Sequence, residues 1–196
     1  MNHCNRLSIA ALMLLLVVGC ASPAGVDYLT LTSPAQDTLR KNAAPLSLGP
    51  VTLPDYLKRS GLARRDSDGA LHYSARELWA EPLDRGIQRT LIEGLSDAMG
   101  NALVVAFPGP SSIAPDYRIA VSVRRLTATS SSVAISATWQ LFGVTGKQQA
   151  SVKQGRFNQE KTLASPTGPD IARGFSELLG ALAIKIADAI PMQRPT

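Results

Sequence analysis

Side chains that could carry out acid–base or nucleophilic chemistry are scarce in this sequence. The 196 residues include two histidines and two cysteines, and His72 has no second histidine or cysteine nearby with which to bind a metal. The sequence has no serine within a G-x-S-x-G motif, the sharp turn that exposes the nucleophile of many hydrolases, and no glycine-rich phosphate-binding motif. We therefore expect no catalytic site, no cofactor and no metal. A hydrolase that uses His72 is the weakest of three functional hypotheses.

The cysteine at position 20 has a more informative context. Residues 7–18 form an apolar run, LSIAALMLLLVV, which follows the single cation Arg6 and leads into VVGC at residues 17–20. At 1.5 Å per residue this run spans about 18 Å, which is too short for the roughly 30 Å hydrocarbon core of a bilayer. It is therefore typical of a cleaved secretory signal and not of a transmembrane helix.

The VVGC sequence resembles the lipobox of bacterial lipoproteins. The resemblance implies that a diacylglycerol alkylates the Cys20 thiol, that residues 1–19 are removed as a signal peptide, and that the new amine receives a fatty acid such as palmitate. Each buried acyl methylene contributes about 0.8 kcal/mol, so two or three chains make dissociation from a membrane very slow. A plain secreted protein with an incidental Cys20 is the alternative. Because Cys4 is lost with the signal, an acylated Cys20 leaves no thiol for a disulfide.

The residues after Cys20 predict a short tether and the membrane that holds it. We assign residues 20–27 to a lipidated tether, which reaches at most roughly 25 Å when extended. Ala21 and Ser22 stand where an aspartate would retain an enteric lipoprotein in the inner membrane. We therefore predict a lipid-anchored protein on the periplasmic face of the outer membrane, with inner-membrane retention as the open alternative.

The rest of the chain has the size and composition of one globular domain. We place this domain at residues 28–190, followed by a flexible tail at 191–196. The formal net charge is +5 and aromatic residues make up 5%, but the cations are dispersed and not clustered beside stacking aromatics, as a nucleic-acid-binding surface would require. We therefore expect no nucleic acid as a partner, and at most a weak attraction to anionic lipid or glycan surfaces.

Hydrophobic periodicity predicts two long helices and a sheet. Apolar residues recur every three to four positions over 82–99 and 167–190, which indicates two amphipathic helices that each bury one face in a core. Gly100-Asn101 is suited to a left-handed cap after the first helix, and Thr167, with Asp170 three residues on, forms an approximate capping box at the start of the second. Alternating or β-branched segments predict strands at 28–32, 46–53, 62–65, 70–73, 103–107, 117–124, 133–141 and 150–157. The expected fold is α+β, a mainly antiparallel sheet with two long helices packed on one face.

Glycine and proline mark three interruptions within this pattern. Gly49-Pro50 predicts a bulge or an edge position in the second strand. Asp68-Gly69 predicts the tight turn of a hairpin. Residues 33–45 are polar and bounded by prolines, and this composition is typical of a loop.

Two further stretches resemble a known family. They are VTLPDYL at residues 51–57 and LWAEPL at residues 78–83, in this order and followed by a helix. The pair is similar to the PqiC family, auxiliary lipoproteins of ABC-type and MCE-type transport systems, over essentially the whole chain after Cys20. The resemblance implies a non-enzymatic auxiliary subunit of a lipid transport system that bridges the inner and outer membranes. Its implied partners are an MCE-domain protein and ABC permease components, while the particular system, the lipid and the direction of transport stay open.

Residues of these two motifs are the candidates for partner contacts. Tyr56 is the strongest, because its phenol presents an apolar ring and a hydrogen-bonding end. Trp79 is either a partner contact or a packing plug before the helix, and Leu53 and Leu57 are expected in the core. The complete set of candidate contacts is Pro54, Asp55, Tyr56, Trp79 and Pro82.

A different functional class fits part of the same pattern. An outer-membrane lipoprotein that regulates a peptidoglycan synthase would also carry a small α+β domain, but it usually needs a long disordered linker to reach through the cell wall. The short tether at residues 20–27 favours the transport hypothesis. Self-association is a further open alternative, because an uncovered sheet face with small alternating residues can pair with a second copy.

Overall fold

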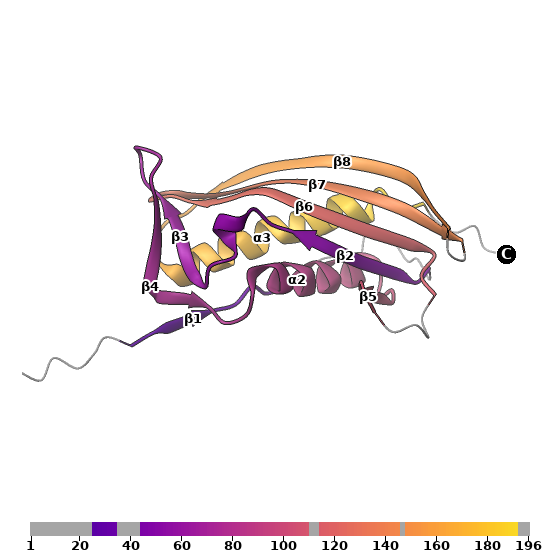
Figure 1. Ribbon diagram of the computed structural model, residues 1–196, viewed down its shortest axis with the longest axis horizontal. Helices are drawn as coiled ribbons and strands as arrows, with labels where there is room; N and C mark the ends of the chain where they lie inside the picture. The colour runs from indigo at the N-terminus through magenta and orange to yellow at the C-terminus, as the bar shows by residue number, and fades with distance from the viewer. Residues whose placement is uncertain (1–24, 35–43, 110–113, 146–147, 192–196) are drawn as a thin grey trace, which may run out of the picture.

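The computed structural model describes residues 25–34, 44–109, 114–145 and 148–191. Within these ranges the chain forms a sheet of eight strands, two α-helices and one 3₁₀ turn (Figure 1). The helical elements are η2 (Asp55–Leu57), α2 (Leu83–Ala98) and α3 (Gly168–Ala187). The strands are β1 (Asp27–Leu29), β2 (Leu46–Thr52), β3 (Gly61–Arg65), β4 (Leu71–Trp79), β5 (Val104–Ala106), β6 (Tyr117–Ala128), β7 (Ser132–Thr145) and β8 (Gln148–Thr162). The predicted signal peptide, Cys20 and residues 192–196 lie outside the described residues.

Both α-helices lie against the same face of the sheet, so the fold has two layers (Figure 1). The core lies between the layers. Ile87 of α2, Leu179 of α3 and Ile119 of β6 have no exposed surface. The burial of one helix face and one sheet face confirms the predicted α+β class, with two long helices on one side of a mainly antiparallel sheet.

The sheet combines antiparallel and parallel pairs. Strands β6, β7 and β8 form an antiparallel meander, and β3 and β4 form an antiparallel hairpin. Parallel pairs join β1 to β4, and β2 to both β5 and β6, while β3 touches β6 at a single parallel position. Hydrophobic periodicity reports which face of a strand is buried but not which strand lies beside it. The parallel pairs therefore have no counterpart among the predictions.

Strand β6 has two different neighbours along one of its edges. Its first half pairs with β2 as far as Ser122, and its last residue, Ala128, pairs with Arg64 of β3. Strand β7 runs along the whole of the other edge. Residues 53–60 connect β2 to β3 and contain η2. The first of the two family motifs therefore lies where the neighbours of β6 change.

The bulge predicted in β2 is present, but in the sheet interior and not at an edge. The register of β2 on β6 shifts between Leu48 and Val51, and β5 pairs with the other side of β2. Gly49 has a φ of 145°, and a Cβ at this position would lie 2.3 Å from the carbonyl oxygen of Phe107. Glycine is therefore required here both by the backbone conformation and by the close approach of a second segment.

Local signals at the helix ends are confirmed. Pro82 is the N-cap residue of α2, and Gly100 and Asn101 follow the helix with φ values of 69° and 63°. This left-handed ending is the one that glycine and asparagine favour. Thr167 caps α3, with its Oγ1 accepting a hydrogen bond from the Asp170 N–H at 3.4 Å.

Element lengths differ from the predictions at both ends of the sheet. Strand β1 ends at Leu29, although the buried Leu31 continues the predicted alternation beyond it. Strand β8 is much longer than the predicted 150–157, because Phe157 is its only buried residue and alternation therefore gives little sign of it. None of the helices in the described ranges has the length and apolarity of a membrane-spanning helix.

Candidate functional site

The two family motifs meet in space at the end of β4. The N–H of Trp79 donates to the carbonyl oxygen of Ser60 at 2.7 Å, and Leu78 pairs with Gly61 at the start of β3. The Tyr73 hydroxyl donates to the carbonyl oxygen of Tyr56 at 3.0 Å. Residues 56–60 are thus held against β4 by one backbone and one side-chain hydrogen bond.

The apolar members of both motifs face the core. Leu57, Trp79 and Leu83 are 5%, 8% and 4% exposed. Together with Leu126 and Phe175 they surround a gap of only about 10 Å³, which means that they pack closely against one another. The structure thus places Trp79 in the core, as the packing alternative expects, and its side chain is not available for a partner.

The acidic residue of the second motif also has an internal role. Glu81 accepts a hydrogen bond from Arg89 of α2 at 2.6 Å, and the same guanidinium donates to the carbonyl oxygen of Leu31 at 2.8 Å. The hydrogen bond to Glu81 raises the pKa of Arg89 above its ordinary value. Glu81 therefore orients a guanidinium that fastens the segment after β1 to α2.

The remaining motif residues reach the surface. Asp55 and Pro82 are exposed, whereas Pro54 and Tyr56 are half-buried. Lys58 forms an ion pair with Asp55 at 2.6 Å, and its hydrogen bond holds the pKa of Asp55 below the ordinary value. We name Pro54, Asp55, Tyr56 and Pro82 the motif surface. It offers a partner two proline rings, a phenol and one carboxylate.

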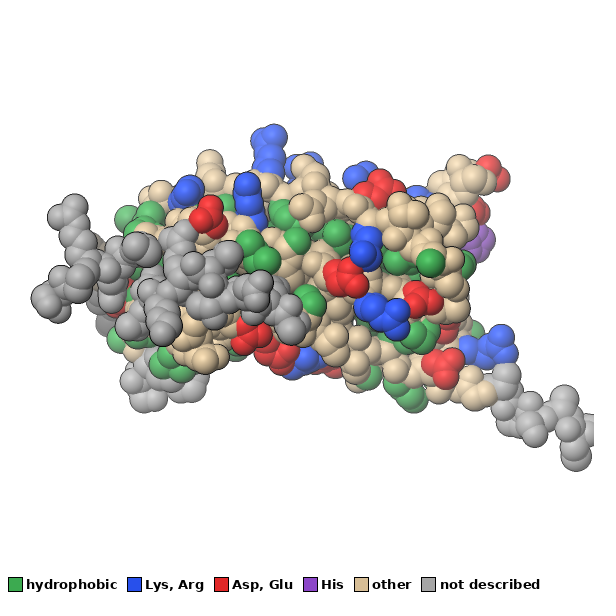
Figure 2. Space-filling view, turned by 180° about the vertical axis from the view of Figure 1, so that it is seen from behind, with side chains coloured by type: hydrophobic (Ala, Val, Ile, Leu, Met, Phe, Trp, Pro, Cys, Tyr) green, Lys and Arg blue, Asp and Glu red, His purple; other side chains and the backbone are tan. Residues whose placement is uncertain are grey.

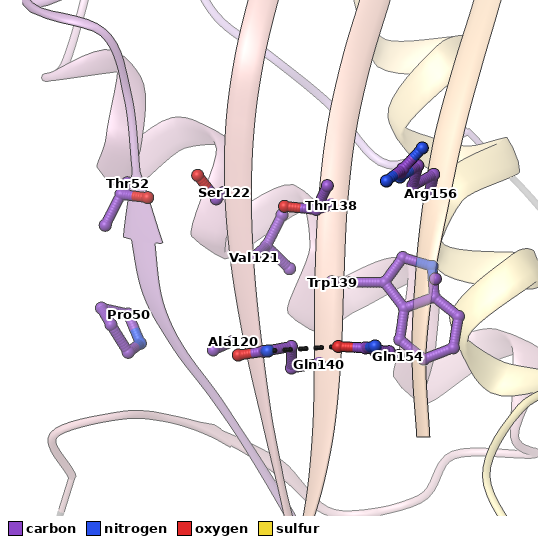
Figure 3. A pocket seen from close by; sticks show the side chains of 11 residues that line it. Pro50, Thr52, Ala120, Val121, Ser122, Thr138, Trp139, Gln140, Gln154 and Arg156 are labelled. Atoms are coloured by element: carbon purple, nitrogen blue, oxygen red, sulfur yellow. Dashed lines mark hydrogen bonds between the residues drawn. The ribbon is translucent and has the colours of Figure 1, made fainter. Parts of the chain in front are cut away.

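A second candidate site is a hollow on the face of the sheet that carries no helix (Figure 3). It has a volume of about 620 Å³ and extends over β2, β6, β7 and β8. Alternation along the strands explains the position, because Val121 and Trp139 are buried toward the helices while Ser122 and Gln140 are exposed on the opposite face. We name this region the sheet hollow. Its main polar lining consists of Thr52, Ser122, Thr138, Gln140, Gln154 and Arg156.

Hydroxyl, amide and guanidinium groups define the chemistry of the sheet hollow. The side-chain amide of Gln140 on β7 donates to Oε1 of Gln154 on the neighbouring strand β8 at 3.5 Å (Figure 3). Arg156 supplies a positive charge. On the opposite, helix-covered face, Gly155 makes room for the indole of Trp139, because a Cβ at Gly155 would lie 2.5 Å from Cζ2 of that ring. Such a shallow polar surface suits hydrogen bonds with another protein or a glycan. The hollow adjoins the motif surface, because Thr52, the last residue of β2, belongs to the first motif and lies two residues before Pro54.

Comparison with known proteins identifies the family. The family model described as "ABC-type transport auxiliary lipoprotein component" matches residues 29–187, which is most of the chain. The chain belongs to this family. The predicted resemblance to PqiC is confirmed.

Relatives and solved structures agree with this assignment. The chain is 33% identical over 105 residues to the intermembrane transport lipoprotein PqiC of Escherichia coli K12 and to that of Shigella flexneri, which covers 52% of this chain and 54% of each relative. It thus spans about half the length of the curated relatives it matches. Two crystal structures share the fold. One, of an uncharacterized protein, has a TM-score of 0.68 at 22% identity and covers 86% of this chain and 100% of that one. The other, from Xanthomonas campestris, has a TM-score of 0.68 at 17% identity and covers 84% and 93%.

The ABC-type auxiliary lipoprotein family is one of transport components and not of enzymes. His72 lies near the start of β4. An imidazole nitrogen of His72 lies 2.8 Å from Oδ2 of Asp66, and this contact holds the pKa of Asp66 below its ordinary value. Oδ1 of Asp66 accepts hydrogen bonds from the N–H groups of Asp68 and Ala70. His72 and Asp66 therefore close the β3–β4 turn. Within the described ranges, no group of three His, Cys, Asp or Glu side chains could hold a metal ion.

The sheet hollow of this auxiliary lipoprotein was not among the predicted sites. Its residues come from four strands and form no motif, although Ser122, Thr138 and Gln140 all occupy the outward positions of predicted strands. The alternation of apolar and polar residues therefore predicted a solvent-exposed face of the sheet, but not which of its outward residues would surround a hollow.

Proposed function

We propose that this protein is a lipid-anchored, non-enzymatic auxiliary subunit of an MCE/ABC-type lipid transport system that bridges the inner and outer membranes. The observation that carries the proposal is the family match over residues 29–187. The predicted lipobox at Cys20 supports the anchor. The printed name of the Escherichia coli relative, an intermembrane transport lipoprotein, supports the role between two membranes.

The anchored end is proposed to touch the outer membrane directly. Only six residues separate Cys20 from Asp27, where β1 begins, and six residues reach roughly 20 Å when extended. Val26 and Tyr28 beside the tether are 45% and 68% exposed. A tyrosine ring with its hydroxyl is suited to the interface between headgroups and acyl chains. Acylation of Cys20 and contact of Tyr28 with lipid would then act at the same end of the domain.

The opposite end is proposed to face a partner in the periplasm. Strand β1 begins at one end of the domain, while β5, the end of β7 and the start of β8 lie at the other (Figure 1). Helix α3 runs along the long axis, and its 20 residues span about 30 Å. The motif surface and the sheet hollow lie between these two ends. They could contact an MCE-domain protein while the lipid chains remain in the membrane.

Site-specific photo-crosslinking in cells tests the proposal. A photoreactive residue placed at Asp55, Pro82 or Thr138 should form products that contain an MCE-domain or ABC permease component. The same residue at Lys185, which is exposed on the helix layer, is the matched control and should form no such product. Products that contain a peptidoglycan synthase and no transport component would contradict the proposal and favour the synthase regulator. Products between two copies from Thr138 would assign the sheet hollow to self-association and leave the motif surface for the transport partner.

A further inference from the structure

A second cationic site lies on the helix-free face, at the end of the domain away from the tether. Arg118, the second residue of β6, has its guanidinium carbon 4.7 Å from the ring centroid of Phe107 and 5.2 Å from that of Phe142. Both distances lie within the range of cation–π interactions. We name these three residues the Arg118 clamp.

The clamp is held in place by the backbone around it. The Phe107 N–H donates to the carbonyl oxygen of Leu48 at 2.8 Å. The carbonyl oxygen of Phe107 accepts a hydrogen bond from the buried Gln88 side-chain amide at 3.3 Å. The same Gln88 amide donates to Leu48 at 2.8 Å. Phe142 stands directly opposite Arg118 in the β6–β7 ladder. The two rings are therefore positioned before any ligand arrives, and this preorganisation lowers the cost of binding.

The clamp leaves polar groups without partners among the described residues. Nε of Arg118 is buried and has no hydrogen-bond acceptor. Ser47, which pairs with Arg118 across β2 and β6, has a buried Oγ that also lacks a partner. Unlike Arg64 and Arg89, Arg118 makes no ion pair with a carboxylate in the part of the chain that the structure describes. Buried donors of this kind are uncommon in native proteins and call for an explanation.

The space beside Arg118 is small and mostly apolar. A cavity of about 240 Å³ has apolar walls that include Val105, Pro115 and Val144, and its polar side chains are Ser47, Arg118 and Gln149. It therefore combines one cation, one hydroxyl, one amide and a set of apolar walls. A ligand that fills it needs one anionic group and a short apolar part.

We propose that the Arg118 clamp binds a carboxylate of a partner protein, at a chain terminus or on an acidic side chain, with an apolar side chain beside it. The two rings cover the faces of the guanidinium, so its edge is the part left for a ligand. A planar carboxylate can accept parallel N–H bonds from the two Nη groups of that edge, because Nε itself is buried. One cation matches one monovalent anion, and the walls match the apolar neighbour.

The position of the clamp favours a partner protein over the bilayer that holds the tether. Arg118 pairs with Phe142 near the end of β7, whereas β1 begins at the other end of the domain (Figure 1). The identification of the occupant as a transport subunit rests on the proposed function. The carboxylate site itself rests on the clamp alone.

The test uses the full-length protein in detergent micelles and follows the Nε–Hε NMR signal of Arg118, which Arg118→Lys identifies by its disappearance. The probes are N-acetyl-leucine, which carries a carboxylate, N-acetyl-leucinamide, which does not, and dihexanoyl phosphatidylglycerol. We expect a saturable shift with N-acetyl-leucine at a concentration on the order of millimolar. The amide should bind at least about tenfold more weakly, because it lacks the charge that strengthens the hydrogen bonds.

Variants and the other probes decide between the remaining explanations. In the variants, binding of N-acetyl-leucine is followed by the Hε signals of the remaining arginines and by the leucine methyl signals. Binding should weaken about tenfold in Arg118→Lys, which loses the planar fork of the guanidinium. It should be unchanged in the control Arg124→Met, which removes an exposed cation on the same strand. Absence of a saturable shift, or equal binding of the amide, would overturn the proposal. Tighter binding of phosphatidylglycerol than of N-acetyl-leucine would also overturn it and assign a lipid headgroup.

The carboxylate-binding test and the crosslinking test can fail independently, so a failure of the clamp is distinguishable from a failure of the proposed function. Carboxylate binding together with no transport component crosslinked from Asp55, Pro82 or Val144 would support the clamp and contradict the transport role. Transport components crosslinked from Asp55 without carboxylate binding would contradict the clamp alone.

Discussion

The motif region and the Arg118 clamp use similar residue types in opposite ways. In the motif region, Trp79 fills the core and Glu81 orients Arg89 toward the backbone. In the clamp, Phe107 and Phe142 enclose Arg118, whose Nε lacks a partner among the described residues. The two motifs that resemble the family thus consist mainly of residues that pack or pair inside the domain. The motif surface keeps Asp55 and Tyr56 for a partner, but the buried polar groups without a partner in the clamp lie where the sequence has no motif.

Sequence distance explains this difference. The motif residues lie within two short stretches, so a fixed order of residue types is visible in the sequence. The clamp joins residues 107, 118 and 142, which meet beside Ser47 only because β5, β2, β6 and β7 are successive neighbours in the sheet. A site built from separated strands leaves no local pattern.

The largest effect should follow from Trp79→Ala. Removing a core indole creates a cavity between Leu57, Leu83 and Phe175, and such changes cost about 3–5 kcal/mol of unfolding free energy. Chemical denaturation of the full-length protein measures this loss. Asp55→Ala, in the exposed part of the same region, is the matched control and should change stability by no more than about 0.5 kcal/mol. Comparable losses in both variants would contradict the division into core and surface members.

An intermediate effect is expected from Glu77→Gln, next to the second motif. Glu77 accepts hydrogen bonds from Nη2 of Arg64 and from the N–H of Gly168 at the start of α3, each at 3.0 Å. The side chains of Arg64 and Glu77 are 28% and 23% exposed. Loss of the charge should cost about 1–3 kcal/mol of unfolding free energy. The control is Glu160→Gln, an exposed carboxylate on β8, which should have little effect.

The Glu77 effect should depend on pH in a defined direction. The hydrogen bond from Arg64 holds the pKa of Glu77 below its ordinary value of 4.5. The contribution of the carboxylate to stability is therefore complete above pH 4.5 and is lost as the pH falls through the lowered folded-state pKa. Denaturation curves at several pH values should show the wild type and Glu77→Gln converging in acid. A difference that grows as the pH falls would contradict this assignment.

The smallest stability change should follow from Arg118→Met. The substitution keeps an apolar stem between the two rings but removes a cation–π contact, while it also removes a buried donor without a partner. These contributions oppose each other, so the net change should stay within about 1 kcal/mol. Arg124→Met is the control for loss of charge on the same strand. A loss of more than about 3 kcal/mol would mean that the clamp is a structural contact.

The sequence predicted those features that have a local cause. Helix caps at Thr167 and Gly100-Asn101 depend on neighbouring residues, and the bulge at Gly49-Pro50 depends on a glycine and a proline side by side. The strand order could not be predicted, because β2 lies between β5 and β6 only through pairing with segments more than fifty residues away. The role of Trp79 was left between packing and partner contact, since an aromatic residue before a helix fits both until its neighbours are known.

The central claim is that an acylated Cys20 holds this transport auxiliary lipoprotein at a membrane. Replacement of Cys20 by serine, followed by fractionation of the cell envelope and mass measurement, tests it most directly, with Ser22→Ala as the control. We predict that the wild type and the control carry an acyl mass and sediment with the outer membrane, whereas Cys20→Ser is neither cleaved after residue 19 nor found in that fraction. A Cys20→Ser protein that is fully processed and still sediments with the outer membrane would contradict the claim.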